Sequence, residues 1–120
     1  IERRMRQVAE HTCAAFEARC EFEFVRNYPP TINSVAEAEF ARQVMIGIVG
    51  EQNVLPQEPT GGAEDFAFML QAKPGSYVWI GNGPTEGSCL LHNPHYDFND
   101  AIIPTGIRYW VRLVERALAG

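Results

Sequence analysis

The chain has 120 residues, of which 46% are hydrophobic and 21% charged, and this is enough for one modest domain but not for two. Its 10 basic and 15 acidic side chains give a net charge of −5, which excludes a nucleic-acid partner. No apolar run approaches the roughly 20 residues that cross a bilayer, and the first residues hold no apolar signal core, so we expect a cytoplasmic protein without a membrane partner.

The first quarter of the chain predicts one helix followed by one strand. Apolar side chains recur with helical spacing over residues 1–18, and the period then changes to two over residues 20–24. The prolines in the segment 27–30 cannot continue a ladder and mark a domain boundary. A lone helix and strand cannot stabilise themselves, and the helical pattern starts at residue 1, so we expect this sequence to be part of a longer protein.

Three further helices are predicted after the boundary. Ser34 and Glu37 form a capping box in front of a helix over residues 34–49. A glycine-containing turn precedes a short helix over residues 63–72. Pro104 suits the first turn of a last helix, which carries an apolar stripe.

Strands are predicted between these helices. Residues 53–58 are a weak candidate, residues 76–80 form a continuous apolar run typical of a strand buried on both faces, and residues 89–91 are a short candidate. A strand of this kind needs the apolar face of the last helix as cover. We therefore expect one core that contains Tyr77, Trp79, Ile107, Trp110 and Val114.

The segment 91–100 holds the densest group of potential metal ligands. Imidazole and carboxylate groups suit zinc or manganese, but a metal site needs three or four ligands and no motif such as H-E-x-x-H is present. The alternative is a turn at Asn93-Pro94, capped by the aspartates, with the histidines on the surface. The residues concerned are His92, His95, Asp97 and Asp100.

The sequence TGGAEDF at residues 60–66 is a second candidate site. Paired glycines at a helix N-terminus let backbone N–H groups approach a carboxylate closely. The alternative is an ordinary tight turn with acidic residues in the first helical turn.

The cysteines give no support for nucleophilic chemistry. They are three in number and form no C-x-x-C pair, and Cys13 lies within a helical pattern and Cys89 beside two leucines, so we expect reduced thiols that act as small hydrophobic side chains. These residues are Cys13, Cys20 and Cys89.

Four motifs follow one another along the chain: YPPTIN at 28–33, PTGGAEDFAFML at 59–70, PGSYVWIGNG at 74–83 and LHNPHYDFND at 91–100. In this order they resemble the C-terminal segments of the metal-dependent amidohydrolases that include hippurate hydrolase, N-acyl-amino-acid aminoacylases and plant auxin-conjugate hydrolases. The resemblance implies an α/β fold. Residues 1–29 would be a helix and strand from an α+β lid or dimerisation domain, and residues 30–120 the C-terminal part of a mixed-sheet, metallopeptidase-like catalytic domain.

The same resemblance implies the chemistry. The parent protein would hydrolyse the amide bond of N-acyl or N-aroyl amino acids with a water activated by two divalent ions of zinc, manganese, cobalt or nickel. His92 matches the family's L-H-[NS]-P motif and is implied as one metal ligand, whereas the remaining ligands and the general base have no counterpart here. The chain alone is therefore expected to be inactive.

Three other residues are implied in substrate binding by their positions in the motifs. Gly61 and Gly62 match a loop that lines the substrate pocket, and Asn33 matches an asparagine near the hinge between the domains. The substrate would be a small N-acyl amino acid, and a homodimer through the lid domain is compatible with the resemblance.

Two functions of other classes remain open. One is a binding or dimerisation module that kept part of the fold and lost catalysis. The other is a small mononuclear metalloprotein that uses His92, His95 and Asp97, which tight stoichiometric metal binding by this chain would favour.

Overall fold

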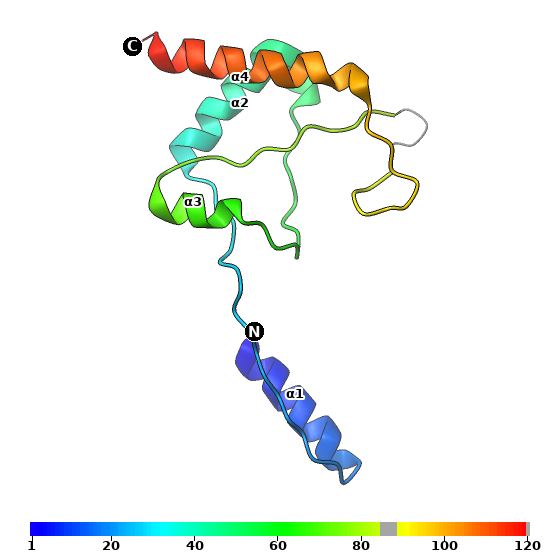
Figure 1. The fold of residues 1–120 in the computed structure, drawn as a ribbon. Coiled ribbons are helices and arrows are strands. Elements are labelled where there is room, and N and C mark those ends of the chain that lie inside the picture. The colour runs from blue at the N-terminus through cyan, green and yellow to red at the C-terminus, as the bar shows by residue number, and fades with distance from the viewer. Residues whose placement is uncertain (85–88, 120) are drawn as a thin grey trace.

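Four α-helices and two short 3-10 helices form the regular structure of residues 1–84 and 89–119, which are the residues that the computed structural model describes (Figure 1). In chain order they are α1 (Glu2–Ala15), α2 (Val35–Val49), η1 (Glu51–Asn53), α3 (Phe66–Ala72), η2 (Asp100–Ile102) and α4 (Ile103–Leu118).

The four predicted helices are confirmed, because the signals that set them are local in sequence. α1 lies within the predicted range 1–18, and α2 begins directly after Ser34. α4 starts one residue before Pro104, which stands in its first turn. α3 begins at Phe66 rather than at residue 63, so the acidic residues precede the helix.

The capping box predicted at the start of α2 does not form. Ser34 makes no side-chain cap to the helix, and its Oγ instead accepts the N–H of Gly75 at 3.2 Å. The Ser34 N–H in turn donates to the carbonyl of Gly75 at 3.0 Å. The start of α2 is thereby tied to the segment that follows α3.

The predicted α/β fold is wrong. No residue within 1–84 or 89–119 belongs to a β-strand, so neither the mixed-sheet domain nor the strand of an α+β lid is present in the described chain. The segments 20–24 and 76–80 have no ladder, and the segment 53–58 starts at the end of η1. The physical reason is that a strand needs the N–H and C=O groups of a neighbouring strand, and this chain brings no such neighbour alongside them.

The segment predicted as the first strand runs back along α1 instead (Figure 1). The Arg6 guanidinium donates to the carbonyl of Phe22 at 3.3 Å and lies 4.8 Å from the centre of the Phe22 ring. Nearer the start of α1, Arg26 forms an ion pair with Glu2. A helix face therefore replaces the missing sheet as the surface on which this segment rests.

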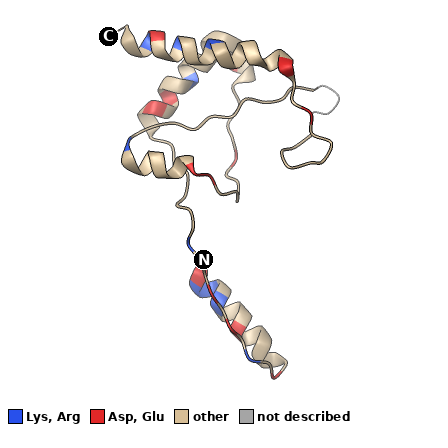
Figure 2. Cartoon of the chain, in the orientation of Figure 1, with Lys and Arg blue, Asp and Glu red and all other residues tan. Residues whose placement is uncertain are grey.

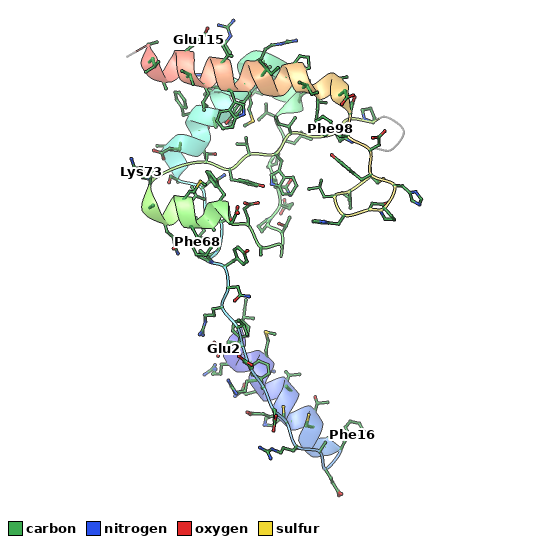
Figure 3. All side chains as sticks on the ribbon, in the orientation of Figure 1. Glu2, Phe16, Phe68, Lys73, Phe98 and Glu115 are labelled. Atoms are coloured by element: carbon green, nitrogen blue, oxygen red, sulfur yellow. The ribbon has the colours of Figure 1, made fainter. Side chains whose placement is uncertain are left out.

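A Schellman turn at the end of α1 reverses the chain. The Ala18 N–H donates to the Cys13 carbonyl at 2.9 Å, and the Glu17 N–H donates to the Ala14 carbonyl at 3.1 Å. Glu17 lies in the left-handed region with a φ of 54°, a conformation that more often takes glycine. The exposed Phe16 marks this far end of the molecule in Figure 3.

α1 and its returning segment stand apart from the rest of the described chain in Figure 1. α1 contacts none of the other described helices, whereas α2 packs against α4. Where the chain leaves this arm, the ring of Tyr28 lies 5.8 Å from the ring of Phe68 on α3 (Figure 3). Whether residues 1–29 and 30–120 are separate domains stays a prediction.

The core is small and lies on a different side of α4 from the one predicted. Trp79, Ile107, Trp110 and Val114 are between 51% and 64% exposed, so the core expected from these residues is wrong. α4 buries Tyr109 instead, on the same side as Arg116, whose guanidinium lies 5.5 Å from the centre of the Phe40 ring of α2. The buried residues are Ala41, Val44, Ala67 and Tyr109.

The described chain is extended. Its radius of gyration is 20.2 Å, whereas a compact domain of this length has a radius of about 14 Å. Its accessible surface is 10090 Å², compared with about 6,500 Å² for a compact protein of the same mass. Much of the extra surface is apolar, including the stripe of α4. Among the described helices, none has the length and apolar character required to span a membrane.

Candidate functional site

His92 occupies a turn that fixes its backbone. The N–H of Asn93 donates to the carbonyl of Leu90 at 3.2 Å, and His92 is the third residue of this four-residue turn. Its φ of 69° lies in the left-handed region, which costs a non-glycine residue about 1–2 kcal/mol. The side chain is exposed, and no hydrogen bond recorded for the described residues uses its imidazole. A strained and exposed histidine of this kind favours a functional role over a packing role.

The turn predicted at Asn93-Pro94 is confirmed. The N–H of Tyr96 donates to the carbonyl of Asn93 at 3.0 Å, and the Asn93 side chain accepts the N–H of His95 at 2.9 Å. The cap is therefore Asn93 itself, and not the aspartates named above. His95, like His92, is exposed.

The described chain does not assemble a metal site by itself. Among residues 1–84 and 89–119, no three His, Cys, Asp or Glu side chains gather where they could hold a metal ion. His92, His95 and Asp97 therefore do not form the mononuclear site considered above. A metal ion bound at His92 would need donors other than the side chains placed here.

Charge around the candidate residues favours a cation over an anion. No Lys or Arg occurs in residues 43–72 or 74–107, which include both glycines and His92. Figure 2 shows the basic side chains mainly on α1 and α4, at a distance from the segment that carries His92. These segments hold acidic side chains and no basic ones, a charge balance that attracts a metal cation.

Gly61 and Gly62 lie in an exposed segment before α3. Neither has a positive φ. A Cβ atom at Gly61 would meet nothing within 4 Å, and one at Gly62 would touch only the Thr60 hydroxyl at 4.0 Å. Nothing in the described chain thus requires glycine at either position.

Asn33 uses its side chain on the backbone of Tyr77. Its Nδ2 donates to the Tyr77 carbonyl at 2.9 Å, and its Oδ1 accepts the Tyr77 N–H at 2.8 Å. The amide thus takes the place of a neighbouring strand for this one residue. One Nδ2 hydrogen remains for another acceptor.

Glu64 connects the glycine-containing turn to Tyr77. Its carboxylate accepts the N–H of Phe66 at 3.0 Å, and this bond, followed by one from the Tyr77 hydroxyl, lowers the pKa of Glu64. The same carboxylate raises the pKa of Tyr77. Asn33, Tyr77 and Glu64 therefore link the start of α2, the segment after α3 and the turn before α3.

Acidification is expected to weaken this link. Folding lowers the pKa of Glu64 below its usual value of 4.5. The ionised carboxylate therefore contributes its full stabilisation above pH 4.5, and this contribution is lost as the pH falls through the lower pKa of the folded chain. Urea unfolding measured between about pH 6 and pH 3 should show a smaller loss of stability for Glu64→Gln than for the wild type. The exposed Glu58, changed to Gln, is the control and should keep the wild-type dependence. Equal slopes for Glu64→Gln and the wild type would contradict the prediction.

The predicted site residues fall into two groups. Asn33 is connected through Tyr77 to Glu64, two residues after Gly62, whereas His92 belongs to another segment. No hydrogen bond or ion pair recorded among the described residues joins the two groups. The sequence did not predict the hydrogen bond between Glu64 and Tyr77. The signal available for it was the position of an acidic residue directly before a helix.

Comparison with known proteins identifies the family. Residues 5–116 match the model of peptidase family M20/M25/M40. The chain belongs to this family. The match confirms the resemblance drawn from the four motifs, and it includes every candidate site residue. No solved structure gives a significant match.

Three relatives illustrate the range of this peptidase family. IAA-amino acid hydrolase ILR1-like 4 of Arabidopsis thaliana is 26% identical over 98% of this chain, and the alignment covers 28% of that protein. Putative amidohydrolase YhaA of Bacillus subtilis is 27% identical over 90% of this chain and 28% of its own length. Thermostable carboxypeptidase 1 of Saccharolobus solfataricus is 33% identical over 74% of this chain and 22% of its own length. The chain thus corresponds to less than a third of each relative.

Proposed function

We propose that this chain is one part of a hydrolase that cleaves the amide bond of N-acyl or N-aroyl amino acids, such as hippurate. The observation that carries the proposal is the match of residues 5–116 to peptidase family M20/M25/M40. The names of two relatives, an IAA-amino acid hydrolase and a putative amidohydrolase, support an amide as the bond that is cleaved. The hippurate-like acyl group rests on the motif resemblance alone.

In this proposal His92 contributes one ligand to a site for divalent metal ions. The support is its exposed imidazole, its left-handed backbone and the lack of Lys and Arg in residues 74–107. Bound metal ions would polarise the amide and activate a water, as zinc does in other hydrolases. Among the described residues, no three potential donor side chains gather, so His92 would need further donors to complete the site. The other donors would come from sequence that is not part of this chain.

Gly61 and Gly62 would line the substrate pocket. Their support is that the described chain itself gives no reason for glycine at either position, whereas close approach of a ligand to the backbone would. Asn33 would contribute through its bonds to the backbone of Tyr77, and its remaining Nδ2 hydrogen is available to a substrate acceptor. A homodimer through residues 1–29 and a cytoplasmic location complete the proposal and stay predictions.

The test compares this chain with a version extended at its N-terminus to the length of its relatives. Both are incubated with hippurate and N-acetyl amino acids in the presence of zinc, manganese, cobalt or nickel, and released amino acid is measured. We expect turnover by the extended protein only, because one ligand cannot position the metal ions. Hydrolysis by this chain alone would contradict the proposal. An extended protein that folds, binds metal and remains inactive would instead support the non-catalytic module.

A further inference from the structure

Two asparagines hold the C-terminal end of the segment that carries His92. Asn82 Nδ2 donates to the carbonyl of Asp97 at 2.7 Å, and Asn82 Oδ1 accepts the N–H of Asn99 at 2.8 Å. Asn99 returns the interaction, because its Nδ2 donates to the carbonyl of Asn82 at 3.0 Å. We call Asn82 and Asn99 the asparagine clasp. The clasp joins residues that are 17 positions apart, so it is a tertiary contact and not a local turn.

The backbone next to the clasp is adapted to it. Gly83 has a φ of 80°, which side-chain-bearing residues rarely adopt. A Cβ atom at this position would lie 3.2 Å from Asn99 Nδ2, which is closer than ordinary packing. The Asn99 side chain would have to shift by a few tenths of an ångström if residue 83 carried a side chain. The glycine therefore allows the close approach that the clasp requires.

Consecutive hydrogen bonds connect the clasp to His92 on one side and to α4 on the other. Toward His92 lie the two turns described above, which Asn93 links with its backbone and side chain. Toward α4, Asn99 Oδ1 accepts the N–H of Ala101 at 3.1 Å and caps η2, which leads directly into α4. Figure 3 shows Phe98, within this stretch, beside the N-terminal end of α4. Hydrogen bonds thus constrain the backbone at intervals of a few residues from Leu90 to the start of α4.

We propose that Asn82 and Asn99 are positioning residues that fix the direction of the His92 side chain. His92 is exposed, and no buried packing holds its turn in place. The clasp anchors the C-terminal end of this segment to Asn82, through the carbonyl of Asp97 and through Asn99. If the clasp is lost, the two turns keep only their local bonds, and His92 can leave its left-handed conformation. This inference rests on the proposed function of His92.

The first test is hydrogen exchange of backbone amides in this chain. Asn82→Ala removes both side-chain bonds of Asn82, and we expect the hydrogen-bonded amides within residues 90–96, those of Asn93, His95 and Tyr96, to exchange at least about fivefold faster, as the loss of a net hydrogen bond implies. Exchange in α2 and the second half of α4 should not change, which separates this effect from general unfolding. Asn53→Ala is the matched control, because Asn53 is another asparagine whose Nδ2 donates to a backbone carbonyl, that of Val49 at 2.7 Å. Unchanged exchange at residues 90–96 in Asn82→Ala would overturn the inference.

A second variant keeps the inference testable if Asn82→Ala does not fold. Asn99→Asp retains an oxygen that accepts the Ala101 N–H, but it loses the donor to the Asn82 carbonyl. We expect the helical signal of α4 to be kept while exchange at residues 90–96 accelerates. Slow, wild-type exchange in this variant would also overturn the inference.

The activity of the extended protein separates this inference from the proposed function. We expect Asn82→Ala to lower both metal affinity and turnover, and Asn53→Ala to change neither. If exchange accelerates while metal affinity and turnover stay at the wild-type level, the proposed role of His92 is wrong and the clasp positions nothing functional. If His92→Ala lowers turnover but Asn82→Ala leaves exchange unchanged, the proposed function stands and the positioning role is wrong.

Discussion

Replacing His92 with alanine in the extended protein is expected to lower turnover by at least about a hundredfold and to remove metal from one of two positions. Loss of a residue that only orients a metal ligand already costs about 10-fold to 100-fold in affinity or activity, so loss of a ligand itself should cost at least as much. Metal content is measured after dialysis, and turnover is measured with a hippurate-type substrate. His95→Ala should have little effect, because His95 is an exposed neighbour outside the motif position.

Two further variants separate the imidazole from the shape of the turn. His92→Gly and His92→Asn both suit a φ of 69°, since glycine and asparagine adopt the left-handed region more readily than other residues. They should preserve or stabilise the turn, yet remain as inactive as His92→Ala. If either variant restores turnover, or if His95→Ala is as damaging as His92→Ala, then His92 is not a metal ligand.

Replacing Tyr109 with alanine is expected to destabilise the packing of α4 on α2 by about 3 kcal/mol, which is typical for loss of a buried aromatic side chain. Tyr109 is only 7% exposed and is the one large side chain in the core of the described chain. Trp110, its immediate neighbour, is 64% exposed and makes an edge contact with the Tyr109 ring. Trp110→Ala should therefore cost much less, near the roughly 0.5 kcal/mol of surface substitutions.

This adjacent pair also tests which side of α4 faces the core. The free energy of unfolding is obtained from urea titrations followed by circular dichroism. The apolar stripe of the sequence places Trp110 in the core, whereas the structure places Tyr109 there. A larger loss from Trp110→Ala than from Tyr109→Ala would show that the stripe, and not the observed face, packs against α2.

The helices could be predicted because each depends on neighbours in sequence. Apolar spacing located α1, Ser34 marked the start of α2, and Pro104 marked the start of α4. The face of α4 that is buried could not be predicted, because spacing shows which side is most apolar and not which side meets a partner. The buried Tyr109 and Arg116, whose guanidinium lies over the Phe40 ring of α2, share a side of α4 that the stripe does not include.

The strands could not be predicted correctly, because a strand exists only beside another strand. Two segments have patterns suited to a sheet: the alternation in residues 20–24 and the apolar run in residues 76–80. In the described chain the first segment lies against a helix face, and the second is hydrogen-bonded to the side chain of Asn33. The candidate site shows the same division. The L-H-N-P motif indicated His92 directly, but the bonds of the asparagine clasp join distant residues and leave no pattern in the sequence.

The large exposed surface of the folded chain has a consequence for its heat capacity. Unfolding changes the heat capacity mainly through the apolar surface that is newly hydrated. The folded chain already has 10090 Å² of accessible surface. The additional area that it exposes on unfolding is therefore about seven tenths of the area that a compact protein of the same mass exposes on unfolding. The heat-capacity increment should be correspondingly small, so the stability curve is flatter and cooling weakens the fold less than it weakens a compact domain of the same length.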